Sequence, residues 1–357
     1  MNNEESYELP QHSYKNSEEN DGFNVVVESI INSEKGCLIL GSAGCGKTHL
    51  TNMLVSALES RDFNIKKLAT TNKASLLING ETLDKFSYSI LRNKASHKIK
   101  QINYLIVDEC SMMREIFYQV LLMLKHHNPE MKIIIVGDFG QLDPVNDRVK
   151  KNYELTRALF ELVDGNKIVL TKCKRSDDVL FNICNDVRKG EAIDTGLFPF
   201  TEPTYLNLCH TNSTRRTLND TCMRRFIKET KPKKTLSFNK LIFDKNSQDI
   251  TIAKGMPIIA RVNRKSLEIA NNECFTIDEL TDDEIIISNE MKSSVAIPVG
   301  DFIKTFNLAF CITIHKSQGA TFNQKYTIYE WSDRMSDKLK YVAISRSSDI
   351  SNIQIRV

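Results

Sequence analysis

The stretch Cys37-Leu38-Ile39-Leu40-Gly41-Ser42-Ala43-Gly44-Cys45-Gly46-Lys47-Thr48 decides the fold of this chain. Its first four residues predict a buried strand, and the pattern G-x-x-x-x-G-K-T then leads into the helical stretch Thr48–Leu58. A glycine-rich turn between a strand and a helix lets backbone N–H groups surround a phosphate, and the helix N-terminus adds positive potential. The stretch therefore predicts a P-loop inside an α/β domain.

The P-loop pattern also assigns ligand contacts. We expect Lys47 to reach the β and γ oxygens of a nucleoside triphosphate and the Thr48 hydroxyl to coordinate Mg²⁺. The expected nucleotide-binding residues of the loop are Gly41, Gly44, Cys45, Gly46, Lys47 and Thr48.

Two further predicted strands end in polar side chains. Tyr104–Val107 runs into Asp108 and Glu109, and Ile133–Val136 runs into a turn that contains Gln141. Parallel strands present their C-terminal ends at one edge of a sheet, where α/β proteins bind ligands. We therefore expect Asp108 to hold the metal through its second shell, Glu109 to polarise the attacking water, and Gln141 to sense the γ-phosphate. The alternative in each case is a solvated turn.

The order of apolar and polar segments predicts the domain organisation. Continuous apolar strands separated by helices indicate a parallel sheet covered on both faces. A second α/β pattern begins at Lys167, and short β-rich pieces interrupt it between about Ile250 and Pro298. The expected parts are a flexible acidic tail (1–21), a first α/β domain (22–148), a second (149–252 and 303–357) and a β-rich insert (253–302).

Composition excludes several classes of protein. The 357 residues are 41% hydrophobic and 26% charged, and no window approaches the roughly 18 apolar residues of a membrane span. The polar, acidic start is unlike a signal or transit peptide. The nine cysteines are scattered without a C-x-x-C pair, which favours reduced thiols over a zinc site. We expect no membrane partner and an intracellular location in a reducing compartment, the cytoplasm or the nucleus.

Five motifs occur in an order that resembles one family. They are GSAGCGKT (41–48), VDECSM (107–112), VGDFGQLDPV (136–145), TIHKSQGAT (313–321) and YVAISR (341–346). Together they are similar to the motif set of superfamily 1 helicases of the RecD/Pif type, and the resemblance extends from Phe23 to Asp349. It implies an α/β fold with two RecA-like P-loop domains and a small β-rich insert in the second, with ATP and Mg²⁺ between the two domains.

The resemblance also implies roles for single residues. Arg175 matches an arginine that reaches the γ-phosphate from the second RecA-like domain, and Arg346 matches a second such arginine. Gly319 belongs to the nucleotide site, and Asn24 stands nearest to a glutamine that reads adenine in the family. The implied nucleic-acid contacts are Thr71, Phe86, Thr211, Asn212, His315 and Lys316. Phe86 stands at helical spacing and is equally consistent with a core position.

The implied activity is ATP-dependent translocation on single strands and 5′→3′ unwinding, with DNA favoured and RNA open. Alternatives are a nucleic-acid-stimulated ATPase that unwinds little and a small-molecule P-loop kinase, although a kinase has no use for the motifs at 313–321 and 341–346. The segment His210–Lys245 carries ten basic and three acidic side chains, which predicts either a strand-binding channel or a solvated helical face.

One interval is shorter than in typical relatives. Phe86 and Asp108 are separated by 22 positions, which leaves Arg92–Asn103 as the connector between a helix and a strand. This connector is basic and offers no aromatic or aliphatic face for a base pair. We therefore expect weak unwinding. The alternative is that the wedge that splits a duplex lies in the β-rich insert.

Overall fold

The computed structural model describes residues 11–13, 21–92, 99–145, 147, 152–289 and 292–357. Within these residues the chain forms two units, Met1–Arg188 (unit 1) and Lys189–Val357 (unit 2). Most of the acidic tail and the middle of the connector at 92–103 lie outside the described residues.

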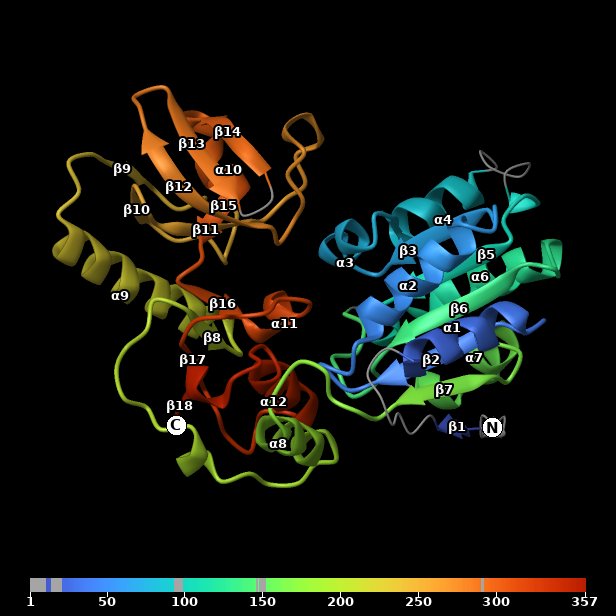
Figure 1. Cartoon of the computed structure of the whole chain (residues 1–357). Coiled ribbons are helices and arrows are strands. Elements are labelled where there is room, and N and C mark those ends of the chain that lie inside the picture. Colours follow the sequence, from blue (N-terminus) through green and yellow to red (C-terminus); the bar gives the residue numbers. More distant parts are fainter. Residues whose placement is uncertain (1–10, 14–20, 93–98, 146, 148–151, 290–291) are drawn as a thin grey trace, which may run out of the picture. The chain divides into compact units, whose positions relative to one another are not determined.

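Unit 1 is built on a seven-stranded sheet with the order β1-β7-β2-β6-β5-β3-β4, in which every neighbouring pair is parallel (Figure 1). The strands are β1 (Gln11–Ser13), β2 (Cys37–Gly41), β3 (Ile65–Ala69), β4 (Glu81–Thr82), β5 (Tyr104–Asp108), β6 (Lys132–Gly137) and β7 (Lys167–Leu170). Because the strands are parallel, β2, β5 and β6 bring their C-terminal ends to one edge of the sheet.

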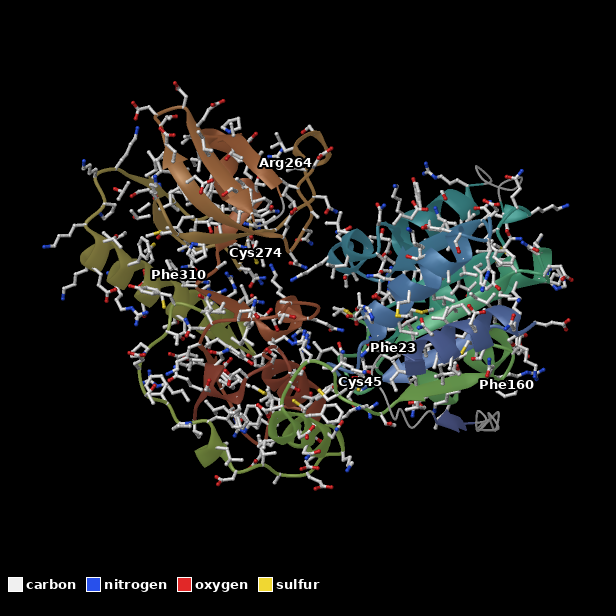
Figure 2. All side chains as sticks on the ribbon, viewed as in Figure 1. Phe23, Cys45, Phe160, Arg264, Cys274 and Phe310 are labelled. Carbon is white, nitrogen blue, oxygen red and sulfur yellow. The ribbon has the colours of Figure 1, made fainter. Side chains whose placement is uncertain are left out.

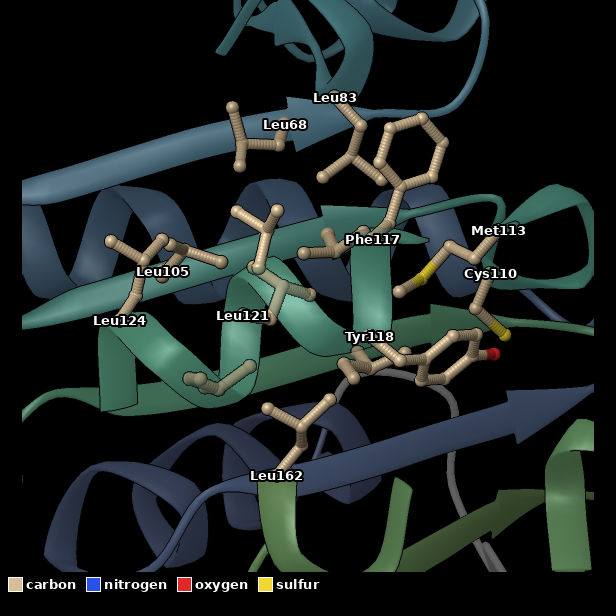
Figure 3. Packing of buried hydrophobic residues seen from close by; sticks show 14 of the residues in the cluster. Leu68, Leu83, Leu105, Cys110, Met113, Phe117, Tyr118, Leu121, Leu124 and Leu162 are labelled. Atoms are coloured by element: carbon tan, nitrogen blue, oxygen red, sulfur yellow. The ribbon is translucent and has the colours of Figure 1, made fainter. Parts of the chain in front are cut away.

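Helices cover both faces of this sheet. They are α1 (Asp21–Asn32), α2 (Lys47–Glu59), α3 (Asn72–Leu77), α4 (Leu83–Leu91), α6 (Glu115–His127) and α7 (Arg157–Leu162), with 3-10 turns at Cys110–Met112 and Tyr153–Leu155. Helix α8 (Asp178–Arg188) ends unit 1. Successive strand residues point to opposite faces. Leu105 of β5 therefore packs with Leu121 and Leu124 of α6 (Figure 3), whereas Ile106 packs with residues of α1 and α2 on the other face. The central strands β2, β5 and β6 are buried on both faces and are therefore mostly apolar, whereas β3 carries Lys66 and Lys67.

Unit 2 combines a parallel sheet with an antiparallel module. The parallel sheet has the order β16-β8-β17-β18, and the antiparallel sheets have the orders β14-β13-β12-β11-β15 and β10-β9. The strands are β8 (Asn207–Cys209), β9 (Thr235–Phe238), β10 (Ile250–Ala253), β11 (Pro257–Ala260), β12 (Cys274–Leu280), β13 (Glu284–Asn289), β14 (Lys292–Pro298), β15 (Phe306–Leu308), β16 (Cys311–Thr313), β17 (Tyr326–Tyr329) and β18 (Ile353–Arg356). The helices are α9 (Asn212–Thr230), α10 (Val299–Thr305), α11 (Ile314–Ser317) and α12 (Asp337–Ile344), with 3-10 turns at Thr195–Leu197, Lys265–Leu267 and Ile350–Asn352.

The predicted fold class is confirmed, because two parallel α/β sheets and a β-rich insert in the second unit are present. The expected boundary between the α/β domains differs from the structure. The strand β7, expected in the second domain, pairs with β2 in the sheet of unit 1, and the units divide after Arg188. Leu38 N–H donates to Asn166 O at 2.9 Å just before β7, so this strand satisfies the backbone of the open edge of β2.

Two smaller expectations also change. The β-rich insert is longer than 253–302, because β9 pairs with β10 and β15 pairs with β11, so that it spans Thr235–Leu308. Residues 1–21 were expected to form only a flexible tail, yet Gln11–Ser13 pairs with β7 as the short edge strand β1. A run of apolar or polar residues does not show which strand it pairs with, because pairing depends on residues far apart in the sequence.

Candidate functional site

The P-loop adopts the geometry that its glycines permit. Gly44 and Gly46 have φ angles of 88° and 81°, in the left-handed region that favours glycine, and α2 begins at Lys47. Lys47 Nζ donates to Gly41 O at 2.7 Å and to Ser42 O at 3.0 Å. Its ammonium group therefore lies inside the loop, where it can meet phosphate oxygens, and Thr48 at the start of α2 is exposed.

Residues far away in sequence support the loop, and sequence reasoning missed them. The Phe23 ring lies 2.9 Å from the position that a β-carbon on Gly46 would take, so only glycine fits there. Phe23 and Cys45 are buried in the same cluster (Figure 2), and burial raises the pKa of the Cys45 thiol to about 11. Ser42 Oγ donates to Asn185 Oδ1 of α8 at 2.7 Å. These contacts join segments with no shared motif, so no signal in the sequence connects them.

The two carboxylates at the end of β5 differ in setting. Asp108 is buried, and burial together with the charge of Glu109 raises its pKa, while the N–H of Glu109 and the charge of Lys47 oppose the rise. Glu109 has a φ of 57°, which is uncommon for a residue with a side chain, and Thr70 Oγ1 donates to its carbonyl at 3.0 Å. A strained residue at this position is a functional candidate. The structure thus brings Lys47, Asp108 and Glu109 together at one edge of the sheet.

This edge fits a magnesium ion bound with a nucleotide. Mg²⁺ prefers oxygen ligands, keeps several waters, and is typically held by one or two carboxylates together with substrate phosphates. Thr48 offers a hydroxyl at the first turn of α2, and Asp108 offers a carboxylate at the end of β5. Both donors are hard oxygens, as this ion requires.

The turn after β6 is tightly packed. Asp138 is fully buried, and its Oδ1 accepts hydrogen bonds from Gly140 N at 3.0 Å and from Arg188 Nε at 3.0 Å. A β-carbon on Gly140 would lie 2.3 Å from Arg188 Nε, so glycine is required for this contact. Gln141, the predicted sensor, is buried and donates its backbone N–H to Asp138 O at 3.0 Å. The pair of Asp138 and Arg188 therefore fixes the turn that carries Gln141.

Arg175 lies beside the P-loop within unit 1, which corrects the expectation that it comes from the second domain. It follows β7, and a β-carbon on Gly44 would lie 3.4 Å from Arg175 Cβ. The neighbouring Lys174 donates its N–H to Gly44 O at 2.9 Å. Asn24, the expected counterpart of an adenine-reading glutamine, is exposed on α1, next to Phe23.

Arg346 and Gly319 both lie in unit 2. Arg346 is buried, and its guanidinium donates to Val342 O at 2.8 Å, to Ala320 O at 3.2 Å and to Ser345 Oγ at 2.8 Å. Gly319 has a φ of 75° in the loop that this arginine holds. Arg346 therefore connects the end of α12 to the TIHKSQG loop, a structural role that its motif does not reveal.

The predicted strand contacts of unit 1 have different outcomes. Phe86 is buried in the core with Leu83 and Ile90, and the prediction that it stacks on a base is wrong because its ring faces protein. Thr71 is half-buried, and its Oγ1 accepts the N–H of Ala74 at 3.1 Å as the N-cap of α3. A hydroxyl that accepts one bond keeps its proton for donation, so Thr71 is still able to bind a phosphate oxygen.

The predicted strand contacts of unit 2 gather at the N-terminus of α9. Thr211 caps this helix, and its Oγ1 donates to Glu330 Oε1 at 2.8 Å. His210 N and Thr211 N also donate to Glu330, at 2.7 and 2.8 Å. Burial alone would raise the pKa of Glu330, but these bonds outweigh it and lower the pKa. Sequence reasoning missed Glu330, which carries no motif.

His315 and Lys316 lie on α11 of the same unit. The rings of His210 and His315 are stacked with centroids 6.5 Å apart, and burial followed by the charge of His210 lowers the pKa of His315. Burial followed by the charges of Arg215 and Arg261 lowers the pKa of Lys316. Asn212, Thr211 and this pair of histidines are thus brought together in unit 2.

The arginines of α9 bind protein groups. Arg215 is buried, and Arg225 donates to Pro203 O at 3.1 Å and to Thr204 O at 2.9 Å. Arg224 pairs with Asp220 at 2.9 Å along the helix, and Arg216 donates to Lys245 O at 2.7 Å. These contacts favour a structural role for the basic helix over the strand-binding channel.

Two further observations concern membrane-spanning helices and cysteines. Among the described residues, no helix has the length and apolar character that crossing a bilayer requires. Each of the nine cysteines is a free thiol.

The comparisons with known proteins agree with the motifs. An AAA domain model matches residues 25–147, about a third of the chain. The chain is 23% identical to the ATP-dependent DNA helicase Pif1 of Bdellovibrio bacteriovorus, over 89% of this chain and 83% of the relative. It is 26% identical to the helicase of the same name from Campylobacter jejuni, over 88% of this chain and 87% of the relative.

A solved structure, Bacteroides Pif1 bound to ssDNA, has a similar fold. Its TM-score is 0.72 at 20% sequence identity, and the alignment covers 94% of this chain and 91% of that chain. The resemblance drawn from the five motifs is thereby confirmed.

Proposed function

We propose, from its resemblance to superfamily 1 helicases of the Pif1 type, that this chain is an ATP-dependent DNA helicase that moves 5′→3′ along a single strand. The observation that carries the proposal is the grouping of Lys47, Asp108 and Glu109 at one edge of a parallel sheet, in a chain whose relatives over most of its length are named DNA helicases. ATP hydrolysis supplies the free energy for movement.

Each residue of the nucleotide site has a separate task. The ammonium of Lys47 binds β and γ oxygens, and the backbone of the P-loop surrounds the β-phosphate. Thr48 and Asp108 would hold Mg²⁺, which neutralises charge on the phosphates when bound. Glu109 orients and polarises the attacking water, and Gln141 donates to the γ-phosphate from the turn fixed by Asp138. Asn24, Arg175, Gly319 and Arg346 complete the proposed nucleotide contacts.

The strand contacts are proposed from hydroxyl, amide, imidazole and ammonium groups. Thr71 in unit 1 and Thr211, Asn212, His315 and Lys316 in unit 2 would bind the phosphodiester backbone. Such groups grip phosphates without reading the sequence. Burial lowers the pKa of both His315 and Lys316.

The test compares three activities of one preparation. ATP turnover is measured without nucleic acid, with single-stranded DNA and with single-stranded RNA, and unwinding is measured on duplexes with a 5′ or a 3′ tail. We expect stimulation by DNA and unwinding of the 5′-tailed duplex only, and Lys47→Ala should abolish both activities. Unwinding from a 3′ tail would refute the polarity, and stronger stimulation by RNA would transfer the proposal to RNA.

A second function, a nucleic-acid-stimulated ATPase with little unwinding, is favoured by the short interval between Phe86 and Asp108. The same experiment distinguishes this function from the helicase, because it predicts full stimulation of turnover with no product strand.

We also propose a reducing intracellular compartment, since the nine free thiols include Cys209 and Cys311 with sulfur atoms 3.4 Å apart.

A further inference from the structure

The loop between β9 and β10 exposes two large apolar side chains. Ile242 is 87% exposed and Phe243 is 101% exposed, the two highest exposures among the large hydrophobic residues described except Val357 at the chain end. Most large apolar residues of unit 2 are buried instead. An isoleucine and a phenylalanine side by side in solvent indicate a contact surface.

The loop that presents them is held by internal hydrogen bonds. Lys240 N donates to Asp249 Oδ1 at 2.7 Å, and Leu241 N donates to Ser247 Oγ at 3.0 Å. Asp244, which follows Phe243, forms an ion pair with Arg261. The two apolar side chains therefore project from an ordered turn that is closed at its base.

The loop is also tied to α9. Arg215 Nη2 donates to Asn246 O at 2.6 Å, and Arg216 Nη1 donates to Lys245 O at 2.7 Å. The same Arg215 donates through Nε to Asn212 Oδ1 at 3.0 Å. One buried arginine thus joins the proposed strand contact Asn212 to the loop, and β9 and β10 lie beside α9 in Figure 1.

We propose that Ile242 and Phe243 form a wedge that stacks on nucleobases where a duplex meets a single strand. This proposal rests on the function proposed above and locates the step that separates the strands. An aromatic ring stacks on any base, since every base has a π-face, and Ile242 adds an aliphatic face.

Charge supports nucleic acid as the occupant. The tip is flanked by Lys240 and Lys245, both exposed, while Asp244 between them is neutralised by Arg261. A cationic rim around an apolar tip suits a base pair with its two phosphate backbones. Arg215 donates both to Asn212 and to the loop, so one side chain links the proposed strand contact to the wedge.

The test measures unwinding per ATP hydrolysed on a 5′-tailed duplex, using single-turnover kinetics. Because loss of a stacking ring weakens base binding by about 5- to 160-fold, Phe243→Ala should lower this ratio by about fivefold or more, and the double substitution with Ile242→Ala should lower it further. Phe243→Trp should restore it. Leu197→Ala is the matched control, because Leu197 is a 49% exposed apolar residue of the same unit outside both proposed sites.

A second readout does not depend on unwinding. A fork with 2-aminopurine at its first base pair is bound by the full chain, and its fluorescence reports disturbance of that pair. We expect a signal with wild type and Phe243→Trp, and its loss with Phe243→Ala. An unchanged ratio and an unchanged fork signal in Phe243→Ala overturn the wedge.

The two proposals fail differently. If wild type hydrolyses ATP without separating strands, the proposed helicase activity fails, and the fork signal still decides whether Phe243 contacts the first base pair. If Phe243→Ala lowers unwinding only in proportion to strand binding, measured on single strands, the tip grips the strand and the wedge is refuted. A protein partner captured at Phe243, with both nucleic-acid readouts unchanged, likewise refutes it.

Discussion

At the scale of single residues, an unusual backbone conformation occurs at a proposed catalytic position. Glu109 has a left-handed φ of 57°, although it carries a side chain, and its neighbour Asp108 is buried. Left-handed backbone costs a residue with a β-carbon about 1–2 kcal/mol. At Glu109 this unfavourable backbone conformation sets the direction of the carboxylate. It is consistent with a water-activating role for Glu109.

Glu109→Gln keeps the shape of the side chain and removes its charge. We expect ATP turnover to fall by about 10²-fold or more, because general-base groups contribute about 10²–10⁴ in rate, while nucleotide and strand affinities remain. Glu109→Gly should be equally inactive without loss of stability, since glycine adopts this φ freely. Turnover of Glu109→Gln within a few-fold of wild type would assign the base elsewhere.

Gly137 provides a prediction on packing. A β-carbon there would lie 2.6 Å from Cys110 Sγ and 2.7 Å from Cys110 N, and backbone cannot move aside easily. Gly137→Ala should therefore lower the free energy of unfolding by about 1–3 kcal/mol. Gly300→Ala is its control: no atom lies within 4 Å of that β-carbon, and alanine favours the helix α10, so stability should stay equal or rise. The measurement is urea denaturation of both variants.

At the scale of elements, the sequence predicted what local pattern determines. The strand–loop–helix context of the P-loop, the strand before Asp108 and the change to β-rich texture near Ile250 are all local signals, and each has its counterpart in the structure. The sheet that receives β7 was predicted wrongly, because the residues Lys167–Leu170 fit either sheet. Phe86 shows the same limit, since a core ring and a stacking ring have the same spacing.

The sequence predicted those site residues that belong to motifs. Lys47, Asp108 and Glu109 could be named from the sequence because their spacing from strand ends is short and fixed. Phe23, Asn185, Arg188 and Glu330 could not, because they meet the motifs only through tertiary packing. Arg346 was identified by its motif, yet its burial against Val342 O and Ala320 O followed only from the fold.

The end of α8 offers a prediction about one element supporting another. Arg188 Nη2 lies 2.9 Å from Asp138 Oδ1, and the aspartate side chain is 0% exposed while the arginine side chain is 33% exposed. Arg188→Met leaves a buried carboxylate without its cation, which we expect to cost about 2 kcal/mol after allowance for the exposed side of the arginine. The measurement is denaturation together with ATP turnover, which should fall because the turn that carries Gln141 loosens.

A double-mutant cycle separates charge from packing in this pair. Asp138→Asn in the Arg188→Met background removes the buried charge, so part of the lost stability should return. If the double variant is as unstable as the sum of the single ones, the pair contributes through packing and its charge coupling is refuted.

At the scale of the whole molecule, two units with separate cores should respond differently to a nucleotide. The P-loop, Asp108 and Glu109 belong to unit 1, whereas Trp331, the one tryptophan in the sequence, is buried in unit 2. Its indole ring lies under Lys340 Nζ at 5.8 Å, so its fluorescence reports unfolding of unit 2. Calorimetry reports both units.

A non-hydrolysable ATP analogue with Mg²⁺, at about 100 times its Kd, should stabilise unit 1 by about 2.7 kcal/mol. For a domain of this size that corresponds to a rise in Tm of about 5–10 °C in the calorimetric transition of unit 1. Lys47→Ala should abolish the rise, because the ammonium that holds the phosphates is gone. The analogue should raise the Tm of the Trp331 fluorescence transition by less. If Arg346→Lys makes this rise smaller, the difference measures what unit 2 contributes to nucleotide binding. If the analogue leaves the calorimetric Tm of unit 1 unchanged in wild type, the nucleotide is bound elsewhere.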